Sequence, residues 1–108
     1  MGSRWTTMAV LSLAAAEGEL RFTELKREMT GVSQKMLAHT LKALERDGIV
    51  DRRVEASKPP RVYYRLTDLG MTLVAPLRSL RAWAEQYIPL VQHNCAVFDA
   101  ADRPDSHG

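Results

Sequence analysis

The segment from Gly31 to Gly48 constrains the fold of this chain most strongly, because it specifies one helix together with both of its ends. Ser33 is a favourable N-cap, and Gly48 is placed to end the helix as the glycine that follows a C-cap. Gly31 suits a tight turn with a positive φ between two helices. Three leucines spaced i, i+4, i+7 form one apolar stripe: Leu37, Leu41 and Leu44. A helix over Ser33–Asp47 is therefore predicted, with a shorter helix before it.

Further elements are predicted on both sides of this helix. Upstream come a helix over Trp5–Ala16, a short extended piece at Leu20–Phe22 and a helix capped by Thr23. Downstream come a strand over Ile49–Glu55, a turn containing two prolines and a returning strand over Arg61–Leu66. Thr67 should cap a final helix, which Pro76 should kink or break near Thr72.

This order of elements is that of a winged helix-turn-helix. The predicted fold class is α+β, mainly α, with a two-stranded wing and a helix at each end. Residues 1–92 should form a single winged helix-turn-helix DNA-binding domain, and residues 93–108, which lack a sustained pattern, should form a loosely ordered tail.

Composition places the chain among ordinary globular domains. Its 108 residues suffice for one core, and 45% are hydrophobic and 26% charged. The single cysteine, Cys95, excludes an internal disulfide and fits a reducing cytosol. The apolar stretch from Met8 to Ala16 is too short to cross a bilayer. We therefore expect a cytoplasmic protein with no membrane association.

Positive charge concentrates in the middle of the chain. The segment from Ser33 to Arg65 contains eight Lys or Arg residues and four Asp or Glu residues, whereas the net charge of the whole chain is +2. A local excess of this kind suits a polyanionic partner such as double-stranded DNA.

The polar face of the predicted second helix carries the candidate base-reading residues. In a helix-turn-helix this helix lies in the major groove, led by its N-terminal residues. The candidates for base contacts are Ser33, Gln34, Lys35, Ala38, His39 and Lys42. The hairpin adds the cations Arg52, Arg53, Lys58 and Arg61, and the expected contacts to the DNA backbone come from Arg21, Arg53, Lys58 and Arg61.

Five motifs, in order and at consistent spacing, resemble the HxlR-type family of winged-helix regulators over roughly Arg4 to Trp83. Arg4-Trp5 resembles the basic-Trp start of the family's first helix. The other four are Arg21-Phe22-Thr23-Glu24-Leu25, Gly31-Val32-Ser33-Gln34-Lys35-Met36-Leu37, Leu44-Glu45-Arg46-Asp47-Gly48-Ile49-Val50, and Pro59-Pro60-Arg61-Val62-Tyr63-Tyr64-Arg65-Leu66-Thr67, with Gly70 and Trp83 following.

The resemblance implies a homodimeric bacterial regulator that binds two-fold symmetric operator DNA. It also implies that residues 1–92 form a DNA-binding and dimerisation domain with terminal dimerisation helices. In the family, the dimer forms through the first and last helices, and both are unusually apolar here. The expected interface residues are Trp5, Met8, Leu73, Leu77, Leu80, Trp83 and Tyr87. Many relatives carry a cysteine just before the first helix; Cys95 does not occupy that position, so a thiol switch is not carried over.

Several other readings remain as alternatives. No arrangement of catalytic residues stands out, so an enzyme is not expected, and neither a cofactor nor a metal is predicted. His93 and Cys95 are a weak metal-binding pair. A winged helix used for protein–protein contact without DNA binding is the main alternative function. A small-molecule effector at the dimer interface is also open, near Trp5, Trp83 and Tyr87.

Overall fold

The computed structural model describes residues 4–102, which form six elements before the last two helices. These are α1 (Arg4–Ala16), β1 (Leu20–Arg21), α2 (Phe22–Glu28), α3 (Gln34–Arg46), β2 (Val50–Glu55) and β3 (Arg61–Leu66). The last two are α4 (Asp68–Met71) and α5 (Val74–Ala101). Within the described residues, those up to Leu77 form one compact unit, and the remainder of α5 belongs to a second unit.

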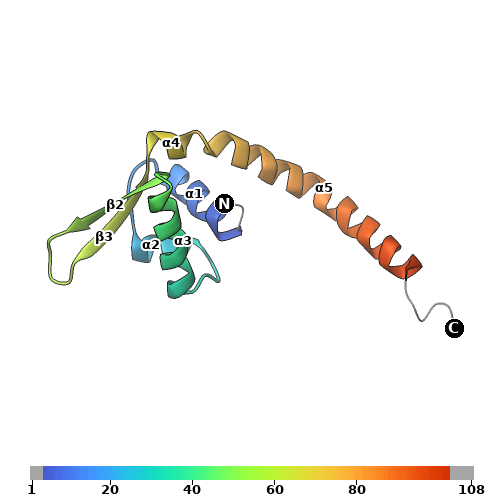
Figure 1. The fold of residues 1–108 in the computed structure, drawn as a ribbon, viewed down its shortest axis with the longest axis horizontal. Coiled ribbons are helices and arrows are strands. Elements are labelled where there is room, and N and C mark those ends of the chain that lie inside the picture. Colours follow the sequence, from blue (N-terminus) through green and yellow to red (C-terminus); the bar gives the residue numbers. More distant parts are fainter. Residues whose placement is uncertain (1–3, 103–108) are drawn as a thin grey trace. The chain divides into compact units, whose positions relative to one another are not determined.

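The predicted winged helix-turn-helix fold is confirmed. Helices α1, α2 and α3 pack together, and the β2–β3 hairpin projects from them as a wing (Figure 1). Strand β1 joins the hairpin, so that the antiparallel sheet has the order β1-β3-β2. Leu20 pairs with Tyr64, which extends the predicted two-stranded wing by a short third strand at its base.

The core of the first unit consists mainly of apolar side chains from helices α1, α2 and α3 and from the wing. The fully buried large side chains are Leu13, Leu25, Met29, Leu37, Leu41, Leu44, Val10 and Val50. Each fully buried Leu contributes about 1.5–3 kcal/mol relative to an exposed one. Because α3 supplies three of these leucines, its orientation, and thus its opposite face, is set by the core.

The ends of α3 follow the predicted caps. The hydroxyl of Ser33 accepts a hydrogen bond from the backbone N–H of Met36 at 3.0 Å. At the other end, Gly48 has φ +75°, and the N–H of Ile49 donates to the carbonyl of Leu44 at 2.9 Å. The N–H of Gly48 donates to Glu45 at 3.0 Å, which completes a Schellman motif.

The start of α2 differs from the prediction. The helix begins at Phe22 after an N-cap at Arg21, so Thr23 lies in its first turn and is not the cap. The backbone N–H of Arg21 donates to the carboxylate of Glu24 at 2.9 Å. This bond is one of the two that make up a capping box, in which the side chain three residues into the helix accepts from the backbone N–H of the N-cap residue. The carboxylate of Glu24 thus caps the start of α2, and a cap by Thr23 is not needed.

The break predicted near Thr72 is confirmed, because α4 ends at Met71 and α5 begins at Val74. Pro76 then lies in the first turn of α5, where a missing N–H costs nothing. The hydroxyl of Thr67 accepts from the N–H of Gly70 at 3.0 Å, as expected of a cap.

The expectation of a loose tail from residue 93 is wrong up to Ala101, because α5 continues to that residue. Residues 93–101 contain no Gly or Pro, and three of them are Ala, the best helix former. Residues 103–108 of the expected tail lie outside the described part of the chain.

Candidate nucleic-acid interface

The polar face of α3 is exposed along its length. All six predicted base-contact residues are exposed, namely Ser33, Gln34, Lys35, Ala38, His39 and Lys42. The opposite face is buried, with Leu37 and Leu41 at 0% and Leu44 at 2% exposure. The predicted reading residues thus lie on one accessible surface and retain polar groups for a partner.

The turn between α2 and α3 is held tightly and braced by α1. Gly31 has φ +91°, as the predicted tight turn requires, and the N–H of Val32 donates to Met29 at 3.1 Å. The indole of Trp5 lies against this turn, since a Cβ built on Gly31 would be 3.8 Å from its ring. Trp5, one of the residues predicted for the dimer interface, therefore packs against the turn between α2 and α3.

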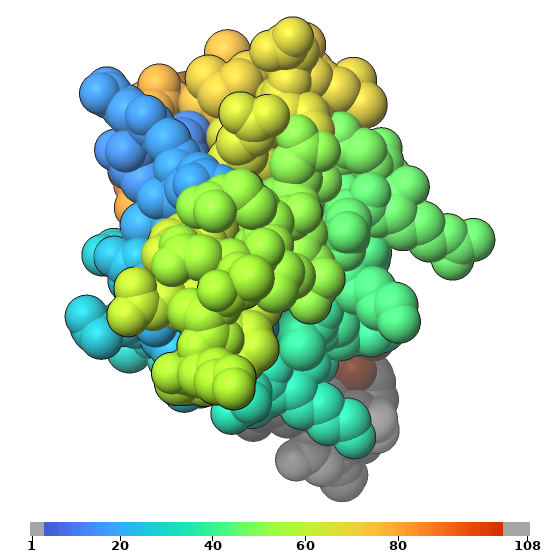
Figure 2. All heavy atoms as spheres, turned by 90° about the vertical axis from the view of Figure 1, so that its left-hand side faces the viewer, coloured from blue at the N-terminus to red at the C-terminus, as the bar shows by residue number. Residues whose placement is uncertain are grey.

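Pairing of the wing strands sorts their side chains onto two faces. Val50 pairs with Leu66, Arg52 with Tyr64 and Val54 with Val62, and these residues share the face directed at the core. The alternate residues point outward, because successive side chains on a strand alternate between its faces. The space-filling view shows the wing in yellow-green in front, with α3 in teal to green along its flank (Figure 2).

The outer face of the wing is a row of ion pairs. Arg53 forms a bidentate pair with Glu19, with N–O distances of 2.9 and 2.8 Å, and its guanidinium lies 4.4 Å from the Tyr63 ring centroid. The hydrogen bond from Arg53 lowers the pKa of the Glu19 carboxyl below its usual value, and the same bond raises the pKa of Arg53. Arg53 is one of the predicted contacts to the DNA backbone, but in the structure its guanidinium is already paired with the carboxylate of Glu19.

Two other arginines on this face also meet carboxylates. Arg61 lies 3.9 Å from Glu55, and Arg65 lies 3.4 Å from Asp51. Each pair is exposed and therefore contributes little to stability, about 0–1 kcal/mol. Of the remaining predicted backbone contacts, Lys58 is exposed in the turn, and Arg21 is half-buried at the end of β1.

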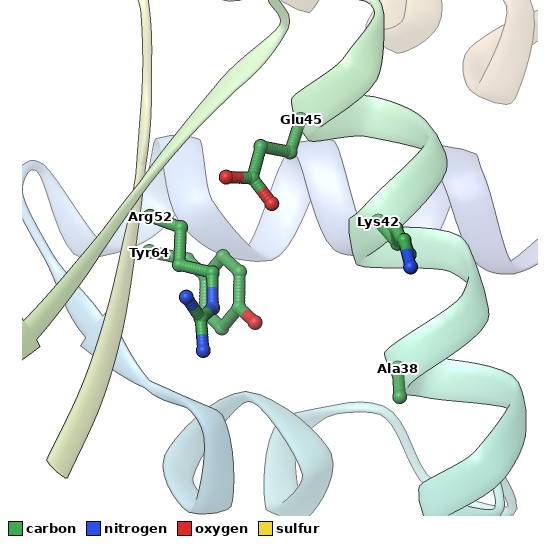
Figure 3. Close-up of a pocket in the computed structure, with 5 residues that line it drawn as sticks. All are labelled: Ala38, Lys42, Glu45, Arg52 and Tyr64. Atoms are coloured by element: carbon green, nitrogen blue, oxygen red, sulfur yellow. The ribbon is translucent and has the colours of Figure 1, made fainter. Parts of the chain in front are cut away.

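A hollow of about 320 Å³ opens between α3 and the inner face of the wing (Figure 3). Its lining residues come from α3, β2 and β3: Ala38, Lys42, Glu45, Arg52 and Tyr64. Arg52 is one of the hairpin cations but not one of the predicted contacts. The sequence indicates its position, because Arg52 lies two residues from both Val50 and Val54 and therefore shares their inward face.

The predicted dimer residues divide between the two units. Met8, Leu73 and Leu77 are half-buried against the core of the first unit. In α5, Leu80, Trp83 and Tyr87 are 59%, 49% and 40% exposed, and the rings of Trp83 and Tyr87 lie 5.5 Å apart between centroids. Large apolar side chains this exposed on one helix are typical of an interaction surface.

No metal site forms within residues 4–102, where no three His, Cys, Asp or Glu side chains come together to hold an ion. His93 and Cys95 both lie on α5, two residues apart, and residues at that spacing do not face each other on a helix. No helix within those residues is both long and apolar enough to span a membrane.

The HxlR-like helix-turn-helix family model matches residues 1–92. The chain belongs to the HxlR-like helix-turn-helix family. The resemblance found in its motifs is thus confirmed, and the matched residues include all the elements that form the candidate interface.

Relatives of this HxlR-like chain carry the names of transcription regulators. It is 42% identical over 89 residues to the uncharacterised HTH-type transcriptional regulator YtfH of Escherichia coli, covering 82% of this chain and 69% of YtfH. It is 39% identical over 87 residues to the HTH-type transcriptional regulator YodB of Bacillus subtilis, covering 81% and 76%.

Solved structures show the same fold. A transcriptional regulator YtfH from Salmonella typhimurium superposes with a TM-score of 0.75 at 39% identity, covering 87% of this chain and 82% of that one. The redox regulator HypR in its reduced form gives 0.74 at 33% identity, covering 85% and 89%. The HxlR-like chain is therefore a helix-turn-helix transcription regulator by family and by fold.

Proposed function

We propose that this HxlR-like regulator binds a pseudo-palindromic operator in double-stranded DNA as a homodimer. The observation that carries the proposal is the exposed polar face of α3 beside a projecting wing, on a family scaffold of transcription regulators. The protein would act in the cytoplasm and associate with the nucleoid when bound to DNA.

Helix α3 would enter the major groove with its N-terminal half leading. Gln34 suits adenine, Lys35 and Lys42 suit guanine or phosphate, and Ala38 can contact a thymine methyl group. Ser33 and His39 lie beside them on the same exposed surface. The N–H groups at the start of α3 can also receive a phosphate.

The wing and β1 would hold the DNA backbone. Lys58 is exposed in the turn, where it can approach phosphates or the minor groove. Arg53 and Arg61 can contribute only if they exchange Glu19 and Glu55 for phosphate. Arg21 would act at the base of the wing.

Dimerisation would use α1 and the apolar residues of α5. The exposed Leu80, Trp83 and Tyr87 would become buried against a second copy, together with Trp5, Met8, Leu73 and Leu77. Two-fold symmetry would then place the two α3 helices about 34 Å apart, one turn of DNA, or a near multiple.

A small-molecule effector at the dimer interface is a further element of the proposal. Solved structures of relatives include a reduced and a diamide-treated YodB and a reduced and an oxidised HypR. The cysteine of this chain, Cys95, is exposed on α5 and does not lie just before the first helix, where many relatives carry a cysteine. We therefore propose that Cys95 is not a sensor.

Selection of bound duplexes from a random pool tests the proposal. We expect a palindromic consensus and an affinity that falls steeply as salt rises, because Lys and Arg displace condensed counterions. No enriched duplex, or binding that is independent of salt, would overturn it and favour a protein–protein interaction module.

A further inference from the structure

The hollow between α3 and the inner face of the wing is lined by two cations that take no part in the ion pairs of the outer face. Lys42 lines it from α3, and Arg52 lines it from β2 (Figure 3). Both side chains are exposed. Among residues 4–102, neither cation forms an ion pair.

Arg52 differs in this respect from the other three arginines of β2 and β3. Arg53, Arg61 and Arg65 each face a carboxylate on the outer side, at 2.8, 3.9 and 3.4 Å. A phosphate that binds one of these must first displace that carboxylate. Arg52 pays no such cost, because its five N–H donors remain available to an incoming anion.

We propose that Arg52 and Lys42 together hold one backbone phosphate of the DNA in this hollow. The proposal rests on the proposed function and adds a positioning residue to it. Arginine binds phosphate through two parallel N–H···O bonds, whereas lysine acts as a point charge. Arg52 thus fixes the geometry of the contact, and Lys42 adds attraction from the opposite wall.

The size and surroundings of the hollow fit this occupant. Its volume of about 320 Å³ is large enough to admit a phosphate group carried on a DNA strand. The ring of Tyr64, 7% exposed, forms a rigid floor. The carboxylate of Glu45 lies at one end, and the guanidinium of Arg52 extends away from it (Figure 3). Repulsion by Glu45 would therefore place the phosphate toward Ala38.

The position of the phosphate links the two elements that contact DNA. Arg52 lies on β2 and Lys42 on α3, so one phosphate bound by both fixes the depth of α3 in the groove relative to the wing. Phosphate contacts set the register of a protein on the duplex and carry no direct sequence information. Arg52 should consequently affect affinity and salt dependence and leave the preferred bases unchanged.

The test compares Arg52→Gln with Arg65→Gln in the full chain, using the duplex selected by the wild type. Both variants remove one arginine charge from the hairpin, Arg52 from its inner face and Arg65 from its outer face, where it pairs with Asp51. Binding is measured by fluorescence anisotropy at several salt concentrations, and circular dichroism checks that both variants are folded. Arg52→Lys and Glu45→Gln complete the set.

We expect Arg52→Gln to weaken binding about tenfold and to lower the slope of log K against log salt by roughly two, one phosphate for each subunit. Arg65→Gln should change affinity less than threefold. Arg52→Lys should keep the slope with intermediate affinity, and Glu45→Gln should tighten binding. An unchanged slope in Arg52→Gln, a larger loss in Arg65→Gln, or an altered consensus in Arg52→Gln overturns the assignment. A wild type that binds no duplex overturns the proposed function itself.

Discussion

Gly70 lies where α4 crosses the start of β2, and no other residue type fits there. A Cβ added to Gly70 would overlap the carbonyl oxygen of Ile49 and lie 3.0 Å from the Cδ2 atom of Leu66. Gly70 does not have a positive φ, so space alone, and not backbone conformation, selects glycine at this position.

The cost of Gly70→Ala follows from the contacts that must move. To relieve the overlap, α4 has to shift away from β2, which stretches two bonds made by Thr67: its N–H to Ile49 at 3.0 Å and its hydroxyl to Gly48 at 2.6 Å. Overpacking costs about 1–3 kcal/mol, and each weakened hydrogen bond costs about 1 kcal/mol. Alanine regains about 1 kcal/mol of helix propensity, so the net loss should be about 2–4 kcal/mol.

Two other glycines provide matched controls. Gly48 has a positive φ with open space around it, so Gly48→Ala should cost about 1–2 kcal/mol from the left-handed conformation alone. A Cβ on Gly18 meets nothing nearer than 4.0 Å, so Gly18→Ala should be neutral or slightly stabilising. Urea unfolding at one fixed protein concentration measures all three, since dimer stability depends on concentration. If Gly70→Ala is as stable as the wild type, helix propensity dominates at this position and the reasoning from the close approach is wrong.

Three further predictions address the interfaces. Leu80→Asp should give monomers in sedimentation velocity, because it places a charge in an apolar contact. Ala82→Asp, on the opposite side of the same helix, should remain dimeric, and a monomeric wild type at micromolar concentration would contradict this prediction. Cys95→Ser should leave operator affinity and any peroxide response unchanged, and loss of such a response would identify Cys95 as the sensor. Lys58→Ala should weaken binding to all sequences by similar factors, while Gln34→Ala should relax the preference at one or two positions of each half-site at a cost of about 1–3 kcal/mol. Repeated binding-site selection distinguishes the last two variants, and a consensus changed by Lys58→Ala alone would make the wing the reading element.

The features of α3 could be predicted from the sequence because each depends on neighbours within one turn. Ser33 caps the N–H of Met36, and the leucine stripe repeats with the period of a helix. Gly48 adopts the positive φ that its place after the helix indicates. Local chemistry of this kind fixed the boundaries of the helix and the face that it exposes.

The end of the chain could not be predicted in the same way. Residues 93–101 lack a strong apolar period, and the final helix was therefore expected to end before them. They form the end of α5 because they contain no Gly or Pro themselves and the helix that begins at Val74 continues past Pro89 into them. Extending an existing helix needs no new nucleus, so weak helix formers suffice there.

The ion pairs of the structure show on which surfaces the local excess of positive charge lies. The cations on the outer face of the wing are matched by Asp51 and Glu55 from the hairpin and by Glu19, which is 34 residues from Arg53 in the sequence. Nothing near Arg53 in the sequence indicates that pairing, so the sequence alone does not show that the charge of Arg53 is already matched. Among residues 4–102, the cations of this region without a carboxylate partner lie on α3, in the wing turn and on the inner wing face: Lys35, Lys42, Arg46, Lys58 and Arg52. The ion pairs thus cancel charge on the outer face of the wing and leave the positive charge along the surfaces that α3 and the wing would turn toward DNA.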